Sequence, residues 1–240
     1  MPGSTSRERP APGRRYSTFV GIAFLVLIVV ATLNTIRTNS GGVLGVTESD
    51  RGMPLPEFAV PNARTGRLDL DANVFQDDCA TSQNPCPPDA RRPSACQIDQ
   101  PRSAAIRVCD LFDRPLVLSF WFTRVADCLP AQDVVDGVAA RYRGRVSFLS
   151  IDVRDDPADV HRIAAERGWS MPVGYDRDGA VSDLYRVGGC PTVAFAYPGG
   201  ILAFAKIGSD YPDDQLSRAS LTADVVRLLR ESRRRAREAR

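Results

Sequence analysis

Histidine is scarce in this sequence, and His161 is the only one among 240 residues. A metal centre built on several histidines is therefore excluded. Glycine and proline contribute 18 residues each, which together stay well below the roughly 25–30% of a chain that is typical of low-complexity sequences. With 43% hydrophobic and 25% charged residues, the composition is that of a globular protein, which excludes wholesale disorder.

The chain also has little net charge, +2 at pH 7, and its arginines are concentrated at the two ends. Residues 1–15 hold four arginines and one glutamate, and residues 227–240 hold seven arginines and two glutamates. The part between them is mildly acidic. Nucleic-acid binders normally carry their positive charge on the folded domain, because contacts to phosphates supply much of the affinity. We therefore expect no nucleic acid among the partners.

Cysteine, by contrast, is abundant for a chain of this length. An even number of cysteines is typical of proteins that mature in an oxidising compartment, where disulfides form and persist. We therefore predict that the domain is exported. The six cysteines are Cys79, Cys86, Cys96, Cys109, Cys128 and Cys190.

An uncharged stretch near the N-terminus supports export. Residues 16–36 carry no charge and contain the apolar run FVGIAFLVLIVVATL, which is long enough for a helix that crosses a bilayer core of roughly 30 Å. Arg14 and Arg15 precede it, so the positive-inside rule predicts a cytoplasmic N-terminus at residues 1–15 and an extracytoplasmic domain. The sequence therefore predicts a single-pass protein of the cell membrane. A cleaved signal peptide is the alternative, and it would also export the domain.

The next segment, residues 37–52, is polar and rich in Gly, Ser and Thr, as expected of a linker between membrane and domain. The folded domain is predicted to begin at residue 53. Residues 115–122 (PLVLSFWF) and 146–152 (VSFLSID) are apolar runs typical of strands buried on both faces. Each is followed by a helical pattern, at residues 130–142 and 157–168. This order predicts a parallel strand pair in an α/β sheet.

The last part of the domain has a different order of elements. Residues 192–197 and 201–208 flank the turn PGG and predict a β-hairpin, so the sheet is predicted to be mixed. A closing helix follows, and we place the end of the domain at residue 230 and a basic tail at residues 231–240. One face of that helix carries Leu221, Val225, Leu228 and Leu229.

Residues 73–110 are predicted to form a cysteine-rich insertion. The segment is rich in Pro, Asp, Arg and Ser, and its four cysteines are spaced by 7, 10 and 13 residues. These spacings lack the short C-x₂₋₄-C pairs of zinc sites, so we expect structural disulfides rather than a metal cluster. The pairing among the four stays open.

Three motifs carry a resemblance to a known family: SFWFTRVADC, MPVGYDRDGAVSDLYRVGGCPT and AYPGGILAFAKIG. They resemble the membrane-anchored TlpA/ResA type of thioredoxin-fold thiol-disulfide oxidoreductase, in the AhpC/TSA–redoxin superfamily. The resemblance covers residues 53–229. It implies a thioredoxin-like mixed β-sheet flanked by helices, a cis-proline at Pro191, and thiol-disulfide exchange with exported protein thiols or disulfides. It implies no cofactor.

This sequence does not keep the C-x-x-C motif of that family, in which a helix N-terminus stabilises the attacking thiolate. A gap-free alignment on the Phe-Trp pair puts Val125 at the position of the first cysteine and Cys128 at the second. An alternative alignment puts Cys128 first, in Cys-Leu-Pro-Ala, but it needs three inserted residues. Ser119 stands where thioredoxins often place a buried acid. Asp127 could cap the helix and would oppose thiolate formation at Cys128.

Cys190 offers a replacement for the missing cysteine. It directly precedes Pro191, at a position that faces the active-site helix in the thioredoxin fold. We therefore hypothesise that Cys128 and Cys190 form a rearranged redox pair, which requires a Cα separation below about 7 Å. The predicted catalytic residues are thus Cys128, Cys190 and Pro191, with no metal or cofactor site.

Two other functions are compatible with these residues. The loss of C-x-x-C would suit a non-catalytic thioredoxin-like module that binds a partner through the face around Pro191. A peroxiredoxin-like antioxidant would use Cys128 alone, although Thr123 lies five residues before it rather than the expected three.

Overall fold

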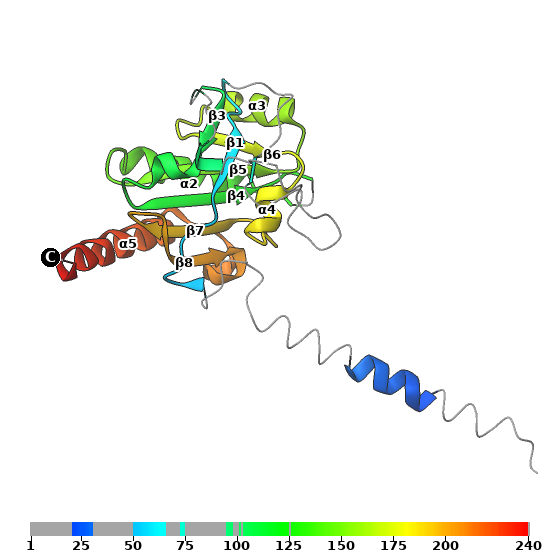
Figure 1. Cartoon of the computed structure of the whole chain (residues 1–240). Helices are drawn as coiled ribbons and strands as arrows, with labels where there is room; N and C mark the ends of the chain where they lie inside the picture. The colour runs from blue at the N-terminus through cyan, green and yellow to red at the C-terminus, as the bar shows by residue number, and fades with distance from the viewer. Residues whose placement is uncertain are drawn as a thin grey trace, which may run out of the picture. The chain divides into compact units, whose positions relative to one another are not determined.

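The computed structural model describes residues 21–30, 50–65, 73–74, 95–97, 101, 103–124 and 126–239. Residues 21–30 are helical, and the chain divides into a unit at residues 1–41 and a unit at residues 42–240 (Figure 1). Within the described ranges no helix is both long and apolar enough to cross a membrane. The predicted span extends beyond residues 21–30 on both sides, outside the described residues, and the predicted cytoplasmic segment lies wholly outside them. The membrane span at residues 16–36 and the cytoplasmic segment at residues 1–15 stay predictions.

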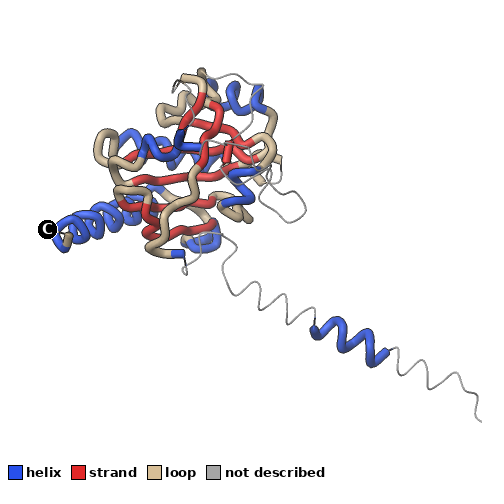
Figure 2. The backbone as a smooth tube through the Cα atoms, in the orientation of Figure 1, coloured by secondary structure: helices blue, strands red, loops and turns tan. Residues whose placement is uncertain are grey.

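The second unit is built on a five-stranded mixed sheet with the order β6-β5-β4-β7-β8. Strands β4 (Leu116–Trp121), β5 (Ser147–Val153) and β6 (Val173–Asp176) run parallel to one another. Strand β7 (Thr192–Tyr197) is antiparallel to β4, and β8 (Ile201–Ile207) is antiparallel to β7, with which it forms a hairpin. The predicted mixed sheet is confirmed, with the apolar run of β4 at its centre. Figure 2 shows these strands in red with helices around them.

Helices cover one face of this sheet. Helices α2 (Leu129–Arg141) and α3 (Pro157–Glu166) are the crossovers between the parallel strands, and α5 (Arg218–Glu238) packs beside α2. Asp156 caps α3 by accepting a hydrogen bond from the backbone N–H of Ala158 at 2.9 Å. The last helix continues as far as Glu238, through residues that the sequence analysis assigned to a basic tail.

The opposite face is covered by α4 (Ala180–Leu184) and by a small antiparallel sheet of order β2-β1-β3. Its strands are β1 (Phe58–Pro61), β2 (Asn73–Val74) and β3 (Ala105–Arg107). A bridge between Asn62 and Gly174 joins this sheet to the edge strand β6.

Close contact between the two sheets depends on one glycine. A Cβ at Gly174 would lie 2.3 Å from Cγ2 of Val60, so any larger residue would push β1 away from β6. Strands β2 and β3 lie within the predicted insertion, and Ile106 and Val108 are buried in the core. The end of the predicted insertion is therefore part of the domain.

Candidate functional site

The site begins where β4 ends. After Trp121 the chain forms a loop that brings Cys128 to the N-cap position of α2, with Pro130 in the first turn, where its missing N–H needs no partner. The carbonyl of Cys128 accepts a hydrogen bond from the N–H of Gln132 at 3.1 Å. The side chain of Cys128 is 1% exposed. The sequence of this segment thus places a sulfur at the positive end of the helix dipole.

The second half of the site is the loop before β7. The Cys190–Pro191 peptide bond is cis, as the family resemblance implies. Cys190 is partly exposed, whereas Pro191 is buried. Gly208 lies against this loop from the end of β8, since a Cβ on it would be 3.1 Å from the carbonyl oxygen of Cys190.

Cys128 and Cys190 are joined by a disulfide, with their Cα atoms 5.9 Å apart although 62 residues separate them in the chain. The separation required by the rearranged-pair hypothesis is therefore present. Both cysteines line a surface groove of about 340 Å³. The groove is also lined by Asp127, Pro130, Ala131, Val134, Pro191, Asp214, Gln215 and Leu216. The structure thus brings the three predicted site residues together at one accessible place.

Beneath the groove, Cys128 belongs to an aromatic cluster. Trp121 and Trp169 meet edge to face with ring centroids 5.2 Å apart, and Tyr175 packs in the same cluster. Such pairs stabilise the arrangement beyond the area they bury. All of these side chains are buried, so partner groups can reach the disulfide only from the groove side.

A neutral hydrogen-bond network replaces the buried acid of thioredoxins. Nε2 of Gln132 donates to Oγ of Ser119 at 2.6 Å, and Oγ of Ser150 donates to Oε1 of Gln132 at 2.9 Å. All three side chains are fully buried between the first turn of α2 and the sheet. Their polar groups satisfy one another, so the network anchors the start of α2 without introducing a charge.

Two buried carboxyl groups hold the loop that leads to Cys128. The backbone N–H of Thr123 donates to Oδ2 of Asp155 at 2.7 Å, and Arg124 forms an ion pair with Oδ1 of Asp155 at 3.4 Å. Asp155 in turn donates its backbone N–H to Oδ1 of Asp152 at 3.1 Å. Burial, with the nearby charge of Asp155 as a second cause, raises the pKa of Asp152 to about 9. Asp152 is therefore neutral at pH 7.

The predicted capping role of Asp127 needs a correction. The N-cap residue of α2 is Cys128, and it makes no side-chain capping bond. Asp127 instead accepts a hydrogen bond from the N–H of Leu129 at 3.3 Å, from an exposed position beside the disulfide. The cap falls one residue later than predicted because Asp127 reaches only the first free N–H of the helix. Its charge still lies next to Cys128.

The structure agrees with the alternative alignment, which puts Cys128 at the first position of the motif, in Cys-Leu-Pro-Ala. Cys128 is the N-cap residue of α2, and Pro130 lies in the first turn of that helix. Val125, which the gap-free alignment puts at the position of the first cysteine, lies outside the described residues.

A second disulfide joins Cys96 and Cys109, with Cα atoms 5.8 Å apart. It connects the short helix η2 (Ala95–Gln97) to η3 (Val108–Leu111), which follows β3. This pair agrees with the expectation of structural disulfides. Cys79 and Cys86 lie outside the described residues. Glu57 is close to both sulfurs, but a disulfide leaves no thiolate to bind a metal.

Sequence reasoning missed Gln132, Asp152 and Asp155. The sequence gives only a weak indication that Gln132 is buried, since it is a polar residue one turn before the apolar positions of α2. Of the other two, Asp152 lies near the end of β5 and Asp155 just after it, in the run DVRDD, and nothing in one sequence shows that these acids turn inward.

The arrangement of a mixed sheet, a helix that begins at Cys128 and a cis-proline opposite it defines a thioredoxin-like fold. Solved structures share this fold, among them the following two. A candidate protein disulfide isomerase from Bacteroides thetaiotaomicron matches with a TM-score of 0.53 and 14% identity over 80% of this chain and 96% of its own. A candidate thiol:disulfide interchange protein DsbE from Chlorobium tepidum matches with a TM-score of 0.50 and 15% identity, over 75% of this chain and 97% of its own.

Among curated proteins, the chain is similar to the thiol-disulfide oxidoreductase ResA of Oceanobacillus iheyensis. The identity is 27% over 105 residues, which are 43% of this chain and 53% of the relative. The chain thus spans about half the length of this relative. The resemblance to ResA-type proteins that the motifs indicate is confirmed at this level. No protein-family model matches the chain.

Proposed function

We propose that this protein is a thiol-disulfide oxidoreductase whose redox pair is Cys128 and Cys190. The observation that carries the proposal is the disulfide between two cysteines 62 residues apart, at a helix N-terminus and beside a surface groove. A disulfide that serves only stability needs neither a helix dipole nor an open groove. Thiol-disulfide exchange needs both, because a thiolate must be stabilised and a partner sulfur must approach.

The two cysteines have different parts in the exchange. Cys190 is partly exposed, whereas Cys128 is buried, so an incoming partner thiolate attacks Sγ of Cys190. The bond between the two protein sulfurs breaks, a mixed disulfide forms between the partner and Cys190, and Cys128 leaves as a thiolate. The N-terminus of α2 favours that negative charge, and the carboxylate of Asp127 opposes it.

A second thiolate of the partner then attacks the partner sulfur of the mixed disulfide. Cys190 is released as a thiolate, the partner keeps a disulfide, and the two electrons remain on the Cys128 and Cys190 pair. In the reverse direction the reduced pair converts a partner disulfide to two thiols. The potential of the partner relative to this pair sets the direction.

We further propose that the partners are exported proteins and that residues 16–36 anchor the domain to the outer side of the cell membrane. The uncharged segment, the arginines before it and the even number of cysteines support this location. The groove beside Pro191, with both acidic and apolar lining, is open to an extended peptide that carries a cysteine.

A trapping experiment with the full chain tests the proposal. The Cys128→Ser variant leaves Cys190 free to attack a cysteine peptide activated as a thionitrobenzoate disulfide, whereas Cys190→Ser leaves only Cys128. We expect a stable mixed disulfide with the peptide in Cys128→Ser, formed at least about tenfold faster than in Cys190→Ser, because access controls the rate.

Each other outcome has a definite meaning. If neither variant reacts faster than a cysteine in an unfolded peptide, the oxidoreductase proposal falls and a non-catalytic binding module takes its place. Faster reaction at Cys128 would keep the exchange but reverse the two parts. Oxidation of Cys128 by peroxide without any reaction with the peptide would favour the antioxidant alternative.

A further inference from the structure

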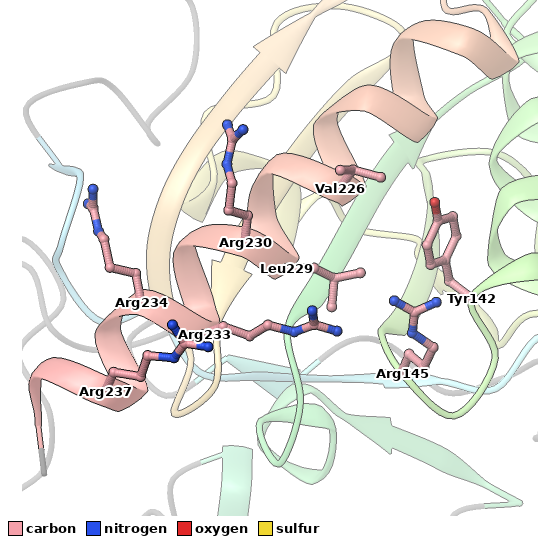
Figure 3. Close-up of a pocket in the computed structure, with 8 residues that line it drawn as sticks. All are labelled: Tyr142, Arg145, Val226, Leu229, Arg230, Arg233, Arg234 and Arg237. Atoms are coloured by element: carbon pink, nitrogen blue, oxygen red, sulfur yellow. The ribbon is translucent and has the colours of Figure 1, made fainter.

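A second groove lies far from the disulfide, between the C-terminal half of α5 and the loop after α2. Its volume is about 610 Å³. Figure 3 shows arginines of α5 on one side and Arg145 on the other, with Tyr142 beside Arg145. The lining residues are Tyr142, Arg145, Val226, Leu229, Arg230, Arg233, Arg234 and Arg237. Five of these eight are arginines and none is acidic.

The positive charge of this groove is poorly compensated. Arg234 pairs with Glu238 at 3.6 Å. Within the described ranges, Arg230, Arg233 and Arg237 have no carboxylate within ion-pair distance. Two other arginines of the same helix behave differently, since Arg227 binds Glu231 at 3.0 Å and Arg235 lies over the ring of Tyr197. These two stabilise the fold. Arg230, Arg233 and Arg237 of the groove are instead available to bind an anion, and Arg145 lies over the ring of Tyr142 at 5.4 Å.

Stabilisation of helix α5 does not explain why these arginines gather at the groove. Cations at a helix C-terminus interact favourably with the dipole, but the effect falls off beyond the last turn. Arg230 lies two turns before the end of α5, and Arg145 belongs to a different element. Arg233 of α5 and Arg145 of the loop after α2 extend toward each other (Figure 3), and guanidinium groups from two elements suit phosphate, which they bind through paired N–H donors.

The groove also has an apolar part. Val226 is 49% exposed, and Leu229 is half-buried beside it. Arginines next to exposed apolar side chains on one helix are typical of segments that lie at the surface of anionic membranes. A nucleic acid or an acidic protein would use the charges but would not need this apolar edge.

The chain itself carries a reason for a lipid to be near. The uncharged segment at residues 16–36 precedes a linker of residues 37–52, which can span at most about 55 Å. We propose that the arginine groove binds the phosphate headgroups of anionic phospholipids in the membrane that the N-terminal segment enters. The proposal depends on the proposed membrane location for its ligand, but not on the redox activity.

Such binding would orient the redox site. The disulfide groove is lined by the beginning of α2 and by residues just before α5, whereas the arginine groove follows the end of α2 and lies along the second half of α5. The two helices therefore run in the same direction, and α2 alone separates the grooves by about 20 Å. With the arginines on the membrane, the Cys128–Cys190 groove would point away from it, toward exported partners.

Hydrogen exchange on the full chain in lipid nanodiscs tests this proposal. We compare discs of phosphatidylcholine with discs that contain about one third phosphatidylglycerol, a proportion that gives a surface potential strong enough to attract basic segments. The expected result is that amides of residues 226–238 exchange at least about fivefold more slowly on the anionic discs, because lipid contact suppresses opening of the helix end. High salt should abolish the difference.

Two double variants of equal charge provide the control. Arg230→Glu with Arg233→Glu should remove the lipid-dependent protection, whereas Arg114→Glu with Arg162→Glu, at exposed positions away from the groove, should keep it. Unchanged exchange in β4 and β5 would show that each variant is folded.

Equal exchange on both kinds of disc would overturn the proposal. Protection by soluble RNA or by an acidic peptide, without any from the anionic discs, would also overturn it and assign the groove to that partner. A chain that fails to enter the discs would instead contradict the proposed membrane location.

Discussion

The two disulfides of the described residues have nearly the same distance between their Cα atoms and very different surroundings. Cys96 and Cys109 lie 5.8 Å apart between Cα atoms, and Cys128 and Cys190 lie 5.9 Å apart. The first closes a short loop between η2 and η3. The second joins a helix N-terminus to a cis-proline loop beside a groove. If Cys128–Cys190 is the redox pair as proposed, the neighbours of a disulfide, and not the distance between its Cα atoms, decide whether it reacts.

Chain entropy alone does not separate the two roles. Closing loops of 13 and 62 residues stabilises the folded state by about 3 and 4 kcal/mol in the simple loop model. Both crosslinks therefore contribute to stability. What distinguishes Cys128–Cys190 is its position at the N-terminus of α2 and beside a groove, which in the proposed exchange would stabilise a leaving thiolate and admit a partner.

The largest difference should be in activity. Replacing Cys128 and Cys190 together by alanine is expected to lower the rate of thiol-disulfide exchange by at least about 100-fold, because the reacting sulfurs are gone. Replacing Cys96 and Cys109 together should leave the exchange rate within about twofold of the wild-type rate, because the Cys128–Cys190 groove stays intact. Reduction of a peptide disulfide by the full chain, whose Cys128–Cys190 pair has first been reduced with dithiothreitol, provides the assay. Similar losses in both variants would end the distinction.

Stability should give the next largest effect. The Cys96→Ala and Cys109→Ala double variant is expected to lose about 2–4 kcal/mol in the free energy of unfolding, from the greater freedom of its unfolded chain. Urea denaturation under non-reducing conditions measures this loss. A change below the error of the method would show that the Cys96–Cys109 disulfide is not a structural support.

A smaller effect is expected at the loop before Cys128. Asp155→Ala removes the acceptor of the Thr123 N–H and the ion pair with Arg124, which should cost about 1–3 kcal/mol, because a donor is left without its partner. The exposed Asp159 is a matched control, and Asp159→Ala should change stability by less than about 0.5 kcal/mol. Equal effects of the two variants would contradict a positioning role for Asp155.

A separate effect, seen only when stability is followed against pH, is expected at Asp152. The pKa of Asp152 is raised from 3.8 to about 9, chiefly by burial, so the folded protein binds this proton more tightly than the unfolded chain. Its contribution to stability is therefore complete below about pH 4 and is lost as the pH rises toward 9. Asp152→Asn stays neutral, so its stability relative to the wild type should increase from pH 5 to pH 9.

Urea denaturation of both proteins at pH 5, 7 and 9 checks this prediction. Asp176, whose pKa burial raises to about 6, titrates in both proteins, so most of its contribution is removed by the comparison. Parallel pH profiles of the wild type and Asp152→Asn would show that Asp152 is ionised in the folded state at neutral pH.

Much of the fold could be predicted from the sequence, because its strands and helices carry strong local signals. The apolar runs that became β4 and β5, and the turn PGG between β7 and β8, locate these elements within one or two residues. Strand β6 and helix α4 were not predicted as separate elements. They are only four and five residues long and leave no clear periodic pattern.

The site was predicted less completely than the fold. The approach of Cys128 and Cys190 followed from the resemblance to a known fold, since 62 residues of separation carry no local signal. The network of Gln132, Ser119 and Ser150 depends on the register of β4 against β5, which places the two serines side by side. The arginine groove likewise needs Arg145 from another element.

Graded reduction of the folded full chain tests the central claim most directly. Samples equilibrated with increasing dithiothreitol are alkylated and digested, and mass spectrometry then gives the fraction of each disulfide that remains. We predict that Cys128–Cys190 opens first, at dithiothreitol concentrations that leave Cys96–Cys109 intact, because the N-terminus of α2 stabilises the Cys128 thiolate that leaves. Simultaneous opening of the two, or earlier opening of Cys96–Cys109, would contradict the assignment of Cys128 and Cys190 as the redox pair.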